Sequence, residues 1–296
     1  MSAARPSAVP PSSVAVFRGR VFAWLQYLLP QHAISRLVLK ATRVRTAWFK
    51  NALIRGFLRM FDVDMQDAVE TDPLAYASFN EFFTRALRPE TRPLAPEAAA
   101  IASPVDGTVS ECGGIDGDLL LQAKGKRYSL ADLLAGHPWA GRFEGGSFAT
   151  IYLAPFNYHR IHMPLRGQLE ATWYVPGRLF SVNALTARFV PRLFARNERI
   201  VTLFETQAGG FALVMVGALN VGSMATVWAG DIAPAARRVI TQLPPATLTL
   251  EKGAEVGRFN MGSTVILLFE PKRVSWRAGL RSGAAVRLGE TIGVLQ

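Results

Sequence analysis

Two patterns of hydrophobic and polar residues follow each other along this chain of 296 residues. Near the N-terminus, Val21–Leu29 is apolar until Pro30 interrupts the run. Apolar residues then recur at spacings of three and four, at Ile34, Leu37, Ala41, Val44 and Trp48. This spacing predicts an amphipathic helix, because it places these side chains on one face while most of the basic residues between them lie on another.

Beyond residue 104 the pattern is typical of β structure. Short runs rich in β-branched and aromatic residues predict strands at Gly146–Leu153, Arg199–Glu205, Phe211–Gly217, Met224–Trp228 and Thr264–Phe269. Gln207–Gly210 has the composition of a hairpin loop between two of them. Short helices are predicted near Leu74–Leu87, Ser129–Leu134 and Val182–Phe189. The sequence therefore predicts the α+β class, with helices first and a β-rich body after them.

One segment is long and uncharged enough to be considered as a membrane-spanning helix. Residues 206–230 carry no charge and are numerous enough to span a bilayer, which takes about 20 apolar residues. The segment also contains five glycines and Asn220. We therefore expect two buried strands with a break around Asn220–Gly222 rather than a spanning helix.

Prolines mark the boundary between the two patterns. Four of them lie between residues 88 and 104. Such a turn-rich segment predicts three parts, which are a basic helical region over 1–87, a boundary over 88–104 and a β-rich body over 105–296.

Charge adds a functional expectation to the helical part. The whole chain has 33 basic and 22 acidic residues, but residues 1–60 contain ten Lys or Arg and no Asp or Glu. The other 236 residues carry 23 basic and 22 acidic ones. A basic helix rich in Trp, Phe and Leu favours the surface of an anionic membrane. Two alternatives stay open from the residues alone, namely a helix packed on the body with solvated charges, and a nucleic-acid site.

The four histidines and the single cysteine limit the chemistry. Cys112 cannot form an internal disulfide or supply a multi-thiolate zinc site. His159 and His162 lie three residues apart in the segment YHRIHMP, and no third ligand pattern accompanies them, so no metal is predicted. Two imidazoles in one pocket suit proton transfer near neutral pH, whereas the alternative is that they only form hydrogen bonds in the core.

Two further segments carry candidate residues. Asp106 lies in SPVDG, where it is either a turn residue or the group that orients a histidine. Ser263 follows Gly262 directly before an apolar strand, and a glycine leaves its carbonyl unshielded towards the serine hydroxyl. Asp106, His162 and Ser263 could therefore also form the catalytic set of a membrane-surface serine hydrolase that leaves the chain intact.

Taken together, these segments resemble the phosphatidylserine decarboxylase family. The resemblance covers roughly residues 75–296, and the N-terminal helices are similar to the membrane-associating helices of bacterial members. It rests on seven segments: Ser103–Gly107, Tyr158–Pro164, Gly262–Thr264, Phe79–Leu87, Tyr174–Asn183, Leu193–Arg199 and Val227–Gly230. One departure is Met261, where the family usually has leucine before Gly-Ser-Thr; volume and polarity stay close.

The resemblance implies a proenzyme that cuts itself between Gly262 and Ser263. The products would be a β chain, 1–262, and an α chain, 263–296, joined as a heterodimer. Ser263 would be the nucleophile and would become a covalent pyruvoyl group, His162 the base and Asp106 its orienter. His159 would handle the proton in decarboxylation. Phosphatidylserine would react through a Schiff base to phosphatidylethanolamine and CO2.

The family also implies a barrel-sandwich-like core and a place for the enzyme. We expect a peripheral protein on the cytoplasmic face of the inner cell membrane, with anionic lipid as partner and no nucleic acid. A homo-oligomer is left open by the sequence.

Overall fold

Strand β15 (Thr264–Phe269) lies at the centre of the protein, and its sequence explains why. All six residues are buried, and five of them are Val, Ile, Leu or Phe. Such a run has no polar face, so it suits a strand that is covered on both faces. It pairs antiparallel with β5 (Ser147–Tyr152) on one edge and with β9 (Gly209–Val216) on the other. The bounds predicted for β15 are confirmed.

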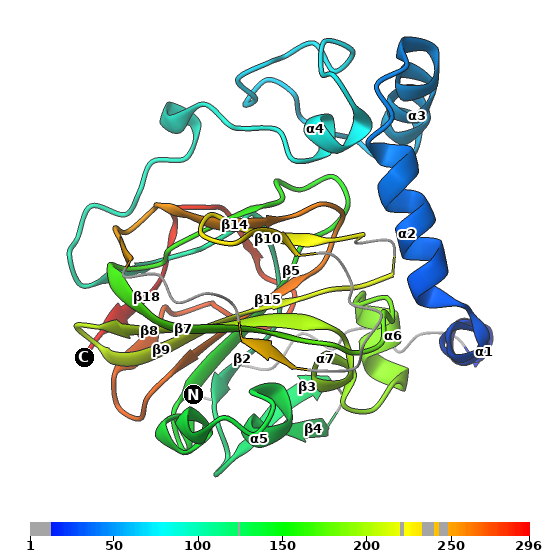
Figure 1. Ribbon diagram of the computed structural model, residues 1–296. Helices are drawn as coiled ribbons and strands as arrows, with labels where there is room; N and C mark the ends of the chain where they lie inside the picture. Colours follow the sequence, from blue (N-terminus) through cyan, green and yellow to red (C-terminus); the bar gives the residue numbers. More distant parts are fainter. Residues whose placement is uncertain (1–12, 124, 220–221, 233–239, 243–247) are drawn as a thin grey trace.

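The computed structural model describes residues 13–123, 125–219, 222–232, 240–242 and 248–296 (Figure 1). The helices are α1 Ser13–Leu28, α2 Gln31–Thr42, α3 Ala47–Met60, α4 Phe79–Phe83, α5 Leu130–Leu133, α6 Ala184–Phe189 and α7 Leu193–Arg196, with 3-10 turns at Pro89–Thr91 and Pro138–Phe143. The remaining strands of the first half are β1 Ala100–Ala102, β2 Gly107–Gly114, β3 Leu119–Ala123, β4 Lys126–Ser129, β6 Arg160–His162, β7 Gly167–Val175 and β8 Arg199–Thr206. Those of the second half are β10 Met224–Thr226, β11 Gly230–Ile232, β12 Thr241–Gln242, β13 Thr249–Leu250, β14 Glu255–Phe259, β16 Val274–Trp276, β17 Ala285–Val286 and β18 Thr291–Leu295.

Most strands belong to one nine-stranded sheet. Its order is β12-β7-β8-β9-β15-β5-β2-β17, and β13 also pairs with β7. Strands β8 and β9 form the predicted hairpin, with Thr206 opposite Gly209 across the turn. The order of the described strands is that of an open sheet and not of a closed barrel. The α+β class is thus confirmed, while the barrel-sandwich description stays a prediction.

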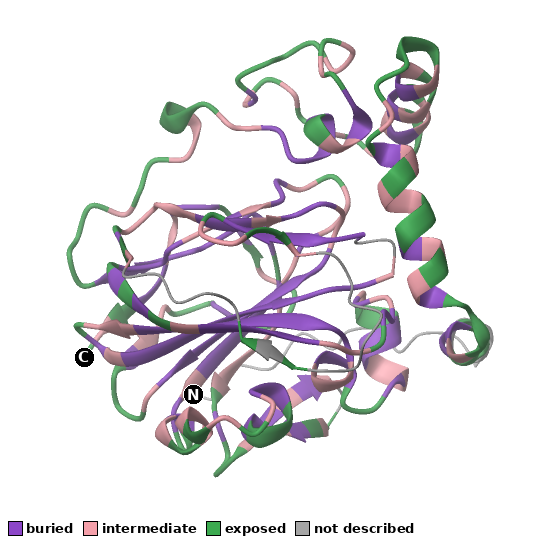
Figure 2. Cartoon of the chain, viewed as in Figure 1, coloured by how far each residue is buried: buried purple, intermediate pink, exposed green. Residues whose placement is uncertain are grey.

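A four-stranded sheet lies beside the first one and carries His162 on β6. Its order is β11-β10-β14-β6. A third sheet, β1-β18-β16, joins the end of the proline-rich boundary to the C-terminus, and β3 pairs with β4. Figure 2 shows that buried residues concentrate in these strands, whereas α2 alternates between exposed and less exposed positions. The uncharged segment 206–230 forms β9 and β10, as two strands were expected there. Residues 220–221 of the expected break lie outside the described residues.

The predicted amphipathic region consists of three helices. Pro30 separates α1 from α2, because it has no N–H to continue the first helix. The stripe from Ile34 to Ala41 lies on α2, but the chain leaves the helix after Thr42 and Trp48 belongs to α3. Within the described residues, no helix is long and apolar enough to cross a membrane.

Buried glutamines fix these helices to the body. The Oε1 atom of Gln26 accepts a hydrogen bond from the Ser181 N–H (2.7 Å), and that of Gln31 accepts one from the Leu179 N–H (2.9 Å). Farther along, Phe57 of α3 packs on the aromatic side chains of α4. The helical region therefore rests on two places of the body, one near α6 and one near the catalytic candidates.

The other predicted elements are also present, with shorter bounds. Helices α4, α5 and α6 lie inside the three predicted helical segments, and β5, β8, β9 and β10 match predicted strands. Strands β2, β7 and β14 and helix α7 were not predicted.

Candidate active site

The predicted cleavage point lies where the chain passes from one sheet to another. Strand β14 belongs to the four-stranded sheet and β15 to the nine-stranded sheet, and Gly262–Ser263 lies between them. The Ser263 carbonyl accepts a hydrogen bond from the Leu153 N–H (2.9 Å), which extends the ladder between β15 and β5 by one residue. Residue 263 is therefore held in the core by its main chain.

Two polar atoms at this point lack a partner. Ser263 is completely buried, and within the described residues its Oγ has no hydrogen bond. The Nε2 atom of His159 is likewise buried and unpaired there. A β-carbon built on Gly262 would lie 3.3 Å from this Nε2 and 3.4 Å from the Leu153 carbonyl oxygen. Because unpaired buried polar atoms cost free energy, they mark a place where chemistry or a ligand completes the arrangement.

The environment of His159 makes its imidazole a neutral acceptor. Its Nδ1 lies 2.8 Å from the Asn157 carbonyl oxygen, which can only accept, so Nδ1 carries the proton and Nε2 has the free lone pair. The ring lies against Phe83 of α4, with 4.1 Å between ring centroids. Burial, with a smaller contribution from the Arg85 charge, lowers the pKa of His159 to about 3.

His162 lies on β6 and has two partners of its own. Its Nδ1 lies 2.8 Å from the Gly253 carbonyl oxygen, and its Nε2 accepts from the Tyr158 hydroxyl at 3.0 Å. Burial lowers the pKa of His162, while the bond to Gly253 and the charges of Glu255 and Asp106 act in the opposite direction. Burial also raises the pKa of Tyr158, which keeps this phenol protonated as the donor.

Asp106 forms a bidentate ion pair with Arg92. The Arg92 Nε and Nη2 atoms donate to the carboxylate at 3.0 and 2.6 Å, and the Leu288 N–H donates at 2.8 Å. Arg92 also binds Asp67 at 2.6 Å, which lowers the pKa of the Asp67 carboxyl. These carboxylates raise the pKa of Arg92, although burial alone would lower it.

The structure brings the predicted site residues together only in part. His159 lies beside Gly262 and Ser263, whereas the hydrogen bonds of His162 go to Tyr158 and Gly253 and those of Asp106 to Arg92 and Leu288. Among the described residues no hydrogen bond joins Asp106, His162 and Ser263 into a chain. The two histidines have separate surroundings instead of one shared pocket.

Several residues that shape this site were not predicted. Arg92 was missed because its partner lies 14 residues away in sequence, and the link between them depends on tertiary structure. Tyr158 and Phe83 lie in two of the segments that resemble the family, Tyr158–Pro164 and Phe79–Leu87. This position was the one feature of the sequence that pointed to a role for them in the site.

Asn260 is a further residue that was missed. Its carbonyl accepts from Asn80 of α4 (3.0 Å), and its amide donates to Ser223 and, at 3.2 Å, to Asp231. Arg43, which follows α2, pairs with Asp231. The chain just before the predicted cut is thus tied to the helical region.

Comparisons with known proteins show which family this chain resembles. A family model described as "Phosphatidylserine decarboxylase" matches residues 79–294, and a second one, described as "PSD", matches residues 21–62. Similar curated proteins, each named "Phosphatidylserine decarboxylase proenzyme", come from Bordetella bronchiseptica (52% identical, covering 93% of this chain and 95% of the relative), Methylococcus capsulatus (50%, 93% and 96%) and Pseudomonas aeruginosa (51%, 93% and 97%).

These matches extend over nearly the whole of both sequences. This chain belongs to the phosphatidylserine decarboxylase family. Membership places it among the carboxy-lyases and favours that class over the serine hydrolase alternative.

Proposed function

We propose that this chain is a self-processing decarboxylase that converts phosphatidylserine to phosphatidylethanolamine and CO2 at a membrane surface. The observation that carries the proposal is the unpaired, buried Ser263 hydroxyl next to Gly262, in a chain of this family. Attack on the carbonyl of the preceding residue needs no access for an external substrate, so the burial of this hydroxyl is compatible with self-cleavage.

The proposed cleavage begins with Ser263 Oγ. It attacks the Gly262 carbonyl carbon, the C–N bond between the two residues breaks, and the hydroxyl proton passes to the released nitrogen, which leaves an ester. Elimination of the Gly262 carboxylate from the Cβ of residue 263 then separates the β chain, 1–262, from the α chain, 263–296. Addition of one water and loss of one ammonia leave a pyruvoyl group on residue 263.

The α chain stays bound after such a cut. Strand β15 is paired along its whole length with β5 and β9, β17 pairs with β2 at one end of the same sheet, and β16 and β18 belong to the three-stranded sheet with β1. We therefore propose a β/α heterodimer held by strand pairing and by the buried core. The three-part division at 1–87, 88–104 and 105–296, and a barrel-sandwich-like description of the body, belong to the same proposal.

The surroundings of residue 263 fit the pyruvoyl group. Support comes from His159 Nε2, a buried and unpaired polar atom beside Gly262 that can accept or donate a proton next to such a group. Once formed, the group supplies a carbonyl that reacts with the lipid amine and takes up the electron pair released with CO2. The Nδ1 atom of His159 is bound to the Asn157 carbonyl, and Nε2 is the ring nitrogen that faces Gly262. We therefore assign Nε2 the role of holding or returning a proton at residue 263.

For the cleavage itself we propose His162 as base and Asp106 as its orienter. Support comes from the half-buried position of His162 and from the charge of Asp106, which acts to raise the pKa of this histidine. The Tyr158 hydroxyl occupies the Nε2 of His162, so this role requires that hydrogen bond to open, or Tyr158 to relay the proton.

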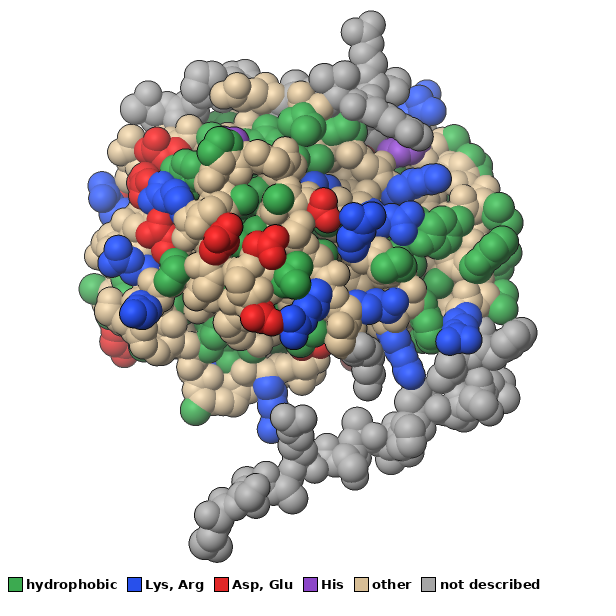
Figure 3. Space-filling model, turned by 90° about the horizontal axis from the view of Figure 1, so that it is seen from below, with side chains coloured by type: hydrophobic (Ala, Val, Ile, Leu, Met, Phe, Trp, Pro, Cys, Tyr) green, Lys and Arg blue, Asp and Glu red, His purple; other side chains and the backbone are tan. Residues whose placement is uncertain are grey.

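The membrane part of the proposal rests on α1–α3. Large apolar side chains are strongly exposed there: Trp24 69%, Leu28 69%, Leu37 69%, Trp48 74% and Met60 72%. Exposed basic residues accompany them: Arg20, Arg36, Lys40, Arg55 and Arg59. Figure 3 shows hydrophobic and basic side chains on the side of the molecule where Figure 1 places these helices, with acidic side chains farther over the body.

This combination matches an anionic membrane surface. A basic residue near such a surface contributes about 1 kcal/mol, and apolar side chains add to this by burial. We propose a peripheral position on the cytoplasmic face of the inner cell membrane, with anionic lipid and not nucleic acid as the partner. Not all the predicted cations take part, because Arg43 pairs with Asp231 and Lys50 is buried and donates to the Leu74 carbonyl.

Intact mass under denaturing conditions tests the self-processing. The wild-type protein should give two species, 1–262 and 263–296, the smaller one lighter than its encoded sequence by one ammonia. Ser263→Ala should give one full-length species and no decarboxylation. Ser282→Ala, which removes an exposed serine of the α chain, is the matched control and should be cleaved normally. Cleavage in Ser263→Ala, or a single full-length mass from an active wild-type preparation, would overturn the proposal.

A further inference from the structure

A cavity between α1 and the body lies apart from the cleavage point. It has a volume of about 710 Å³ and is lined by α1, by Lys126 of β4 and by Arg188 and Phe189 at the end of α6. This volume is within the range of small-molecule sites, which is about 300–1,000 Å³. Neither Ser263 nor either of the two candidate histidines lines the cavity, so it has no part in the reaction proposed above.

Three cations meet in this cavity without a carboxylate. Arg20, Lys126 and Arg188 come from three different elements and have no ion pair within the part of the chain that the structure describes. The guanidinium carbon of Arg188 lies 5.6 Å from the centre of the Phe189 ring. Three positive charges brought together repel one another, so their convergence is best explained by an anion that binds between them.

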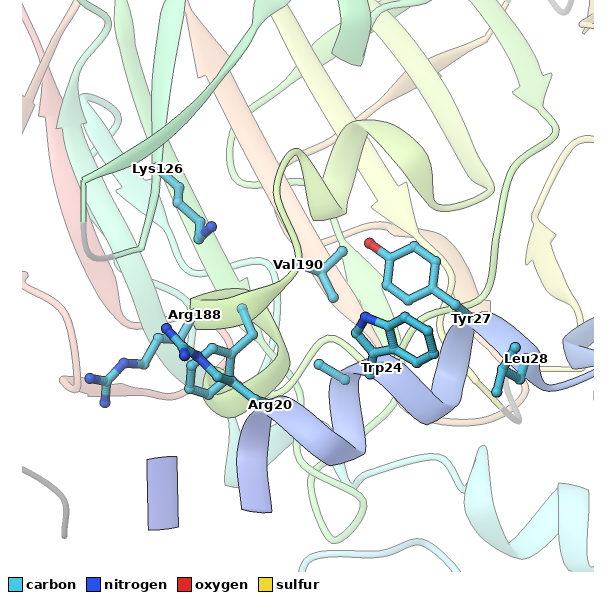
Figure 4. A pocket seen from close by; sticks show the side chains of 9 residues that line it. Arg20, Trp24, Tyr27, Leu28, Lys126, Arg188 and Val190 are labelled. Carbon is cyan, nitrogen blue, oxygen red and sulfur yellow. The ribbon is translucent and has the colours of Figure 1, made fainter. Parts of the chain in front are cut away.

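The rest of the cavity is aromatic and aliphatic. Arg20, Trp24, Tyr27 and Leu28 follow one another on one face of α1, so the lining changes from charged to apolar over about 12 Å of helix. Figure 4 shows the same separation, with the three cations on one side and Trp24, Tyr27 and Leu28 on the other. The Tyr27 hydroxyl already accepts from Arg196 at 2.9 Å, which leaves its ring as the surface towards the cavity.

The apolar end of the cavity continues into the exposed surface of α1. Trp24 and Leu28 are each 69% exposed, and Leu25 beside them is 53% exposed. An anion that also has acyl chains would place its charge among the cations and its chains along Trp24 and Leu28. Inorganic phosphate would use only the first half of this lining, and a zwitterionic lipid would bring a cation of its own to the charged end.

We infer that this cavity binds the headgroup of one anionic phospholipid as a non-substrate site, separate from Ser263. The lipid would join α1 to α6 while the helices lie on the membrane. Helix α1 already packs closely there, since a β-carbon on Gly19 would lie 2.7 Å from side-chain atoms of Leu185 and Phe189. The inference goes beyond the proposed decarboxylation, because it needs neither chain cleavage nor a lipid amine.

Binding of a short-chain lipid below its micelle concentration tests this site. The probe is dihexanoyl phosphatidylglycerol, which has no amine and cannot react at residue 263, and its binding is followed by titration calorimetry and native mass spectrometry. One molecule should bind per chain, and equally to Ser263→Ala. Dihexanoyl phosphatidylcholine and inorganic phosphate, the two comparison probes, should each bind at least about tenfold more weakly.

Charge-removing variants identify the place of binding. The pocket variant combines Arg20→Gln, Lys126→Gln and Arg188→Gln, and the control removes the same charge from exposed positions of the body with Arg166→Gln, Lys272→Gln and Arg281→Gln. The pocket variant should lose at least about tenfold in affinity, and the control should not change. A charge-retaining variant, Arg20→Lys with Arg188→Lys, should keep the affinity within about threefold and so exclude a folding defect.

Three results would overturn the inference. They are unchanged binding in the pocket variant, equal losses in the pocket and control variants, and equal affinity for phosphatidylcholine or phosphate. None of them bears on the proposed function, because self-cleavage and decarboxylation of the same preparations are measured separately by mass and by CO2 release.

Discussion

Strand β15 and helices α1–α3 both carry runs of large apolar residues, but their exposure to solvent is opposite. Every side chain of β15 is buried between neighbouring strands. On the helices, Trp48 is 74% exposed and Leu37 69%. The body therefore satisfies its hydrophobic residues internally, and the helices need a partner outside the chain.

The same comparison holds for polar groups. The body buries unpaired polar atoms, such as Ser263 Oγ and His159 Nε2, at the point where chemistry is proposed. The helices keep most of their cations in solvent. The unpaired polar atoms at the proposed reaction point lie in the core of the body, and the most exposed large apolar side chains lie on the helices. Substitutions made separately in the two regions test whether the buried polar groups serve the reaction and the exposed apolar residues serve membrane binding.

The largest effects are expected from the two histidines in the body. His162→Ala should remain uncleaved, whereas His159→Ala should mature and then lose about 10²- to 10⁴-fold in decarboxylation, the range for loss of a proton-transfer group. Intact mass reports the first step and CO2 release the second.

Tyr158→Phe separates the two ways in which His162 can act. It removes the hydroxyl bound to His162 Nε2 and little volume. Cleavage at the wild-type rate or faster indicates that His162 acts directly, whereas loss of cleavage indicates a relay through the phenol. A His159→Ala protein that stays uncut would refute the proposed division of roles and assign the unpaired Nε2 beside Gly262 to self-processing.

A smaller effect is expected at a buried carboxyl of the body. Glu198 is 1% exposed and accepts a hydrogen bond from the Tyr174 hydroxyl at 2.9 Å. Burial raises the pKa of Glu198 to about 7 from its ordinary value of 4.5. The free energy of unfolding should therefore be highest below pH 4.5 as far as this group is concerned, and should fall as pH rises towards 7.

Urea unfolding at a series of pH values measures this contribution. Because one pKa unit corresponds to about 1.4 kcal/mol, the loss is on the order of 3 kcal/mol. Glu198→Gln should remove this part of the pH dependence. The control variant Glu251→Gln changes a side chain that is 70% exposed, and its stability should depend on pH as that of the wild type does. An identical pH dependence in Glu198→Gln and wild type would contradict the assigned cause.

The sequence predicted features that depend on neighbouring residues, and it missed features that depend on contacts between distant segments of the chain. Thr264–Phe269 was predicted with its bounds because a fully apolar run bounded by Gly262 and Pro271 identifies a central strand locally. The hairpin after Thr206 is equally local. By contrast, nothing in the sequence showed that β14 and β15 belong to different sheets, although this places the Gly262–Ser263 step between them.

The same limit applies to the candidate site. The motifs supplied Asp106, His159, His162 and Ser263, but not their partners. The pairing of Asp106 with Arg92, and the contact of His159 with Phe83, depend on tertiary packing across the chain. The break between α2 and α3 was also missed, because the apolar spacing continues through it without proline or glycine.

The smallest effect concerns the exposed residues of α2 and α3. Leu37→Ser combined with Trp48→Ser should weaken binding to vesicles that contain phosphatidylglycerol by about thirtyfold, since each side chain loses about 1 kcal/mol of partial burial. Co-sedimentation with the vesicles measures this. Self-cleavage should be unchanged, because neither residue lies at the Gly262–Ser263 step.

The matched control changes exposed apolar residues of the body. Val227 is 50% exposed and Val294 45%, so Val227→Ser with Val294→Ser removes comparable surface hydrophobicity away from the helices. This control should bind vesicles like the wild type. If the control and the helix variant lose binding equally, the membrane is not recognised by α2 and α3. If neither loses binding while the α1 cavity variant does, then the anchor is α1 alone. A loss confined to the helix variant would show that the apolar residues left uncovered on α2 and α3 are covered by lipid.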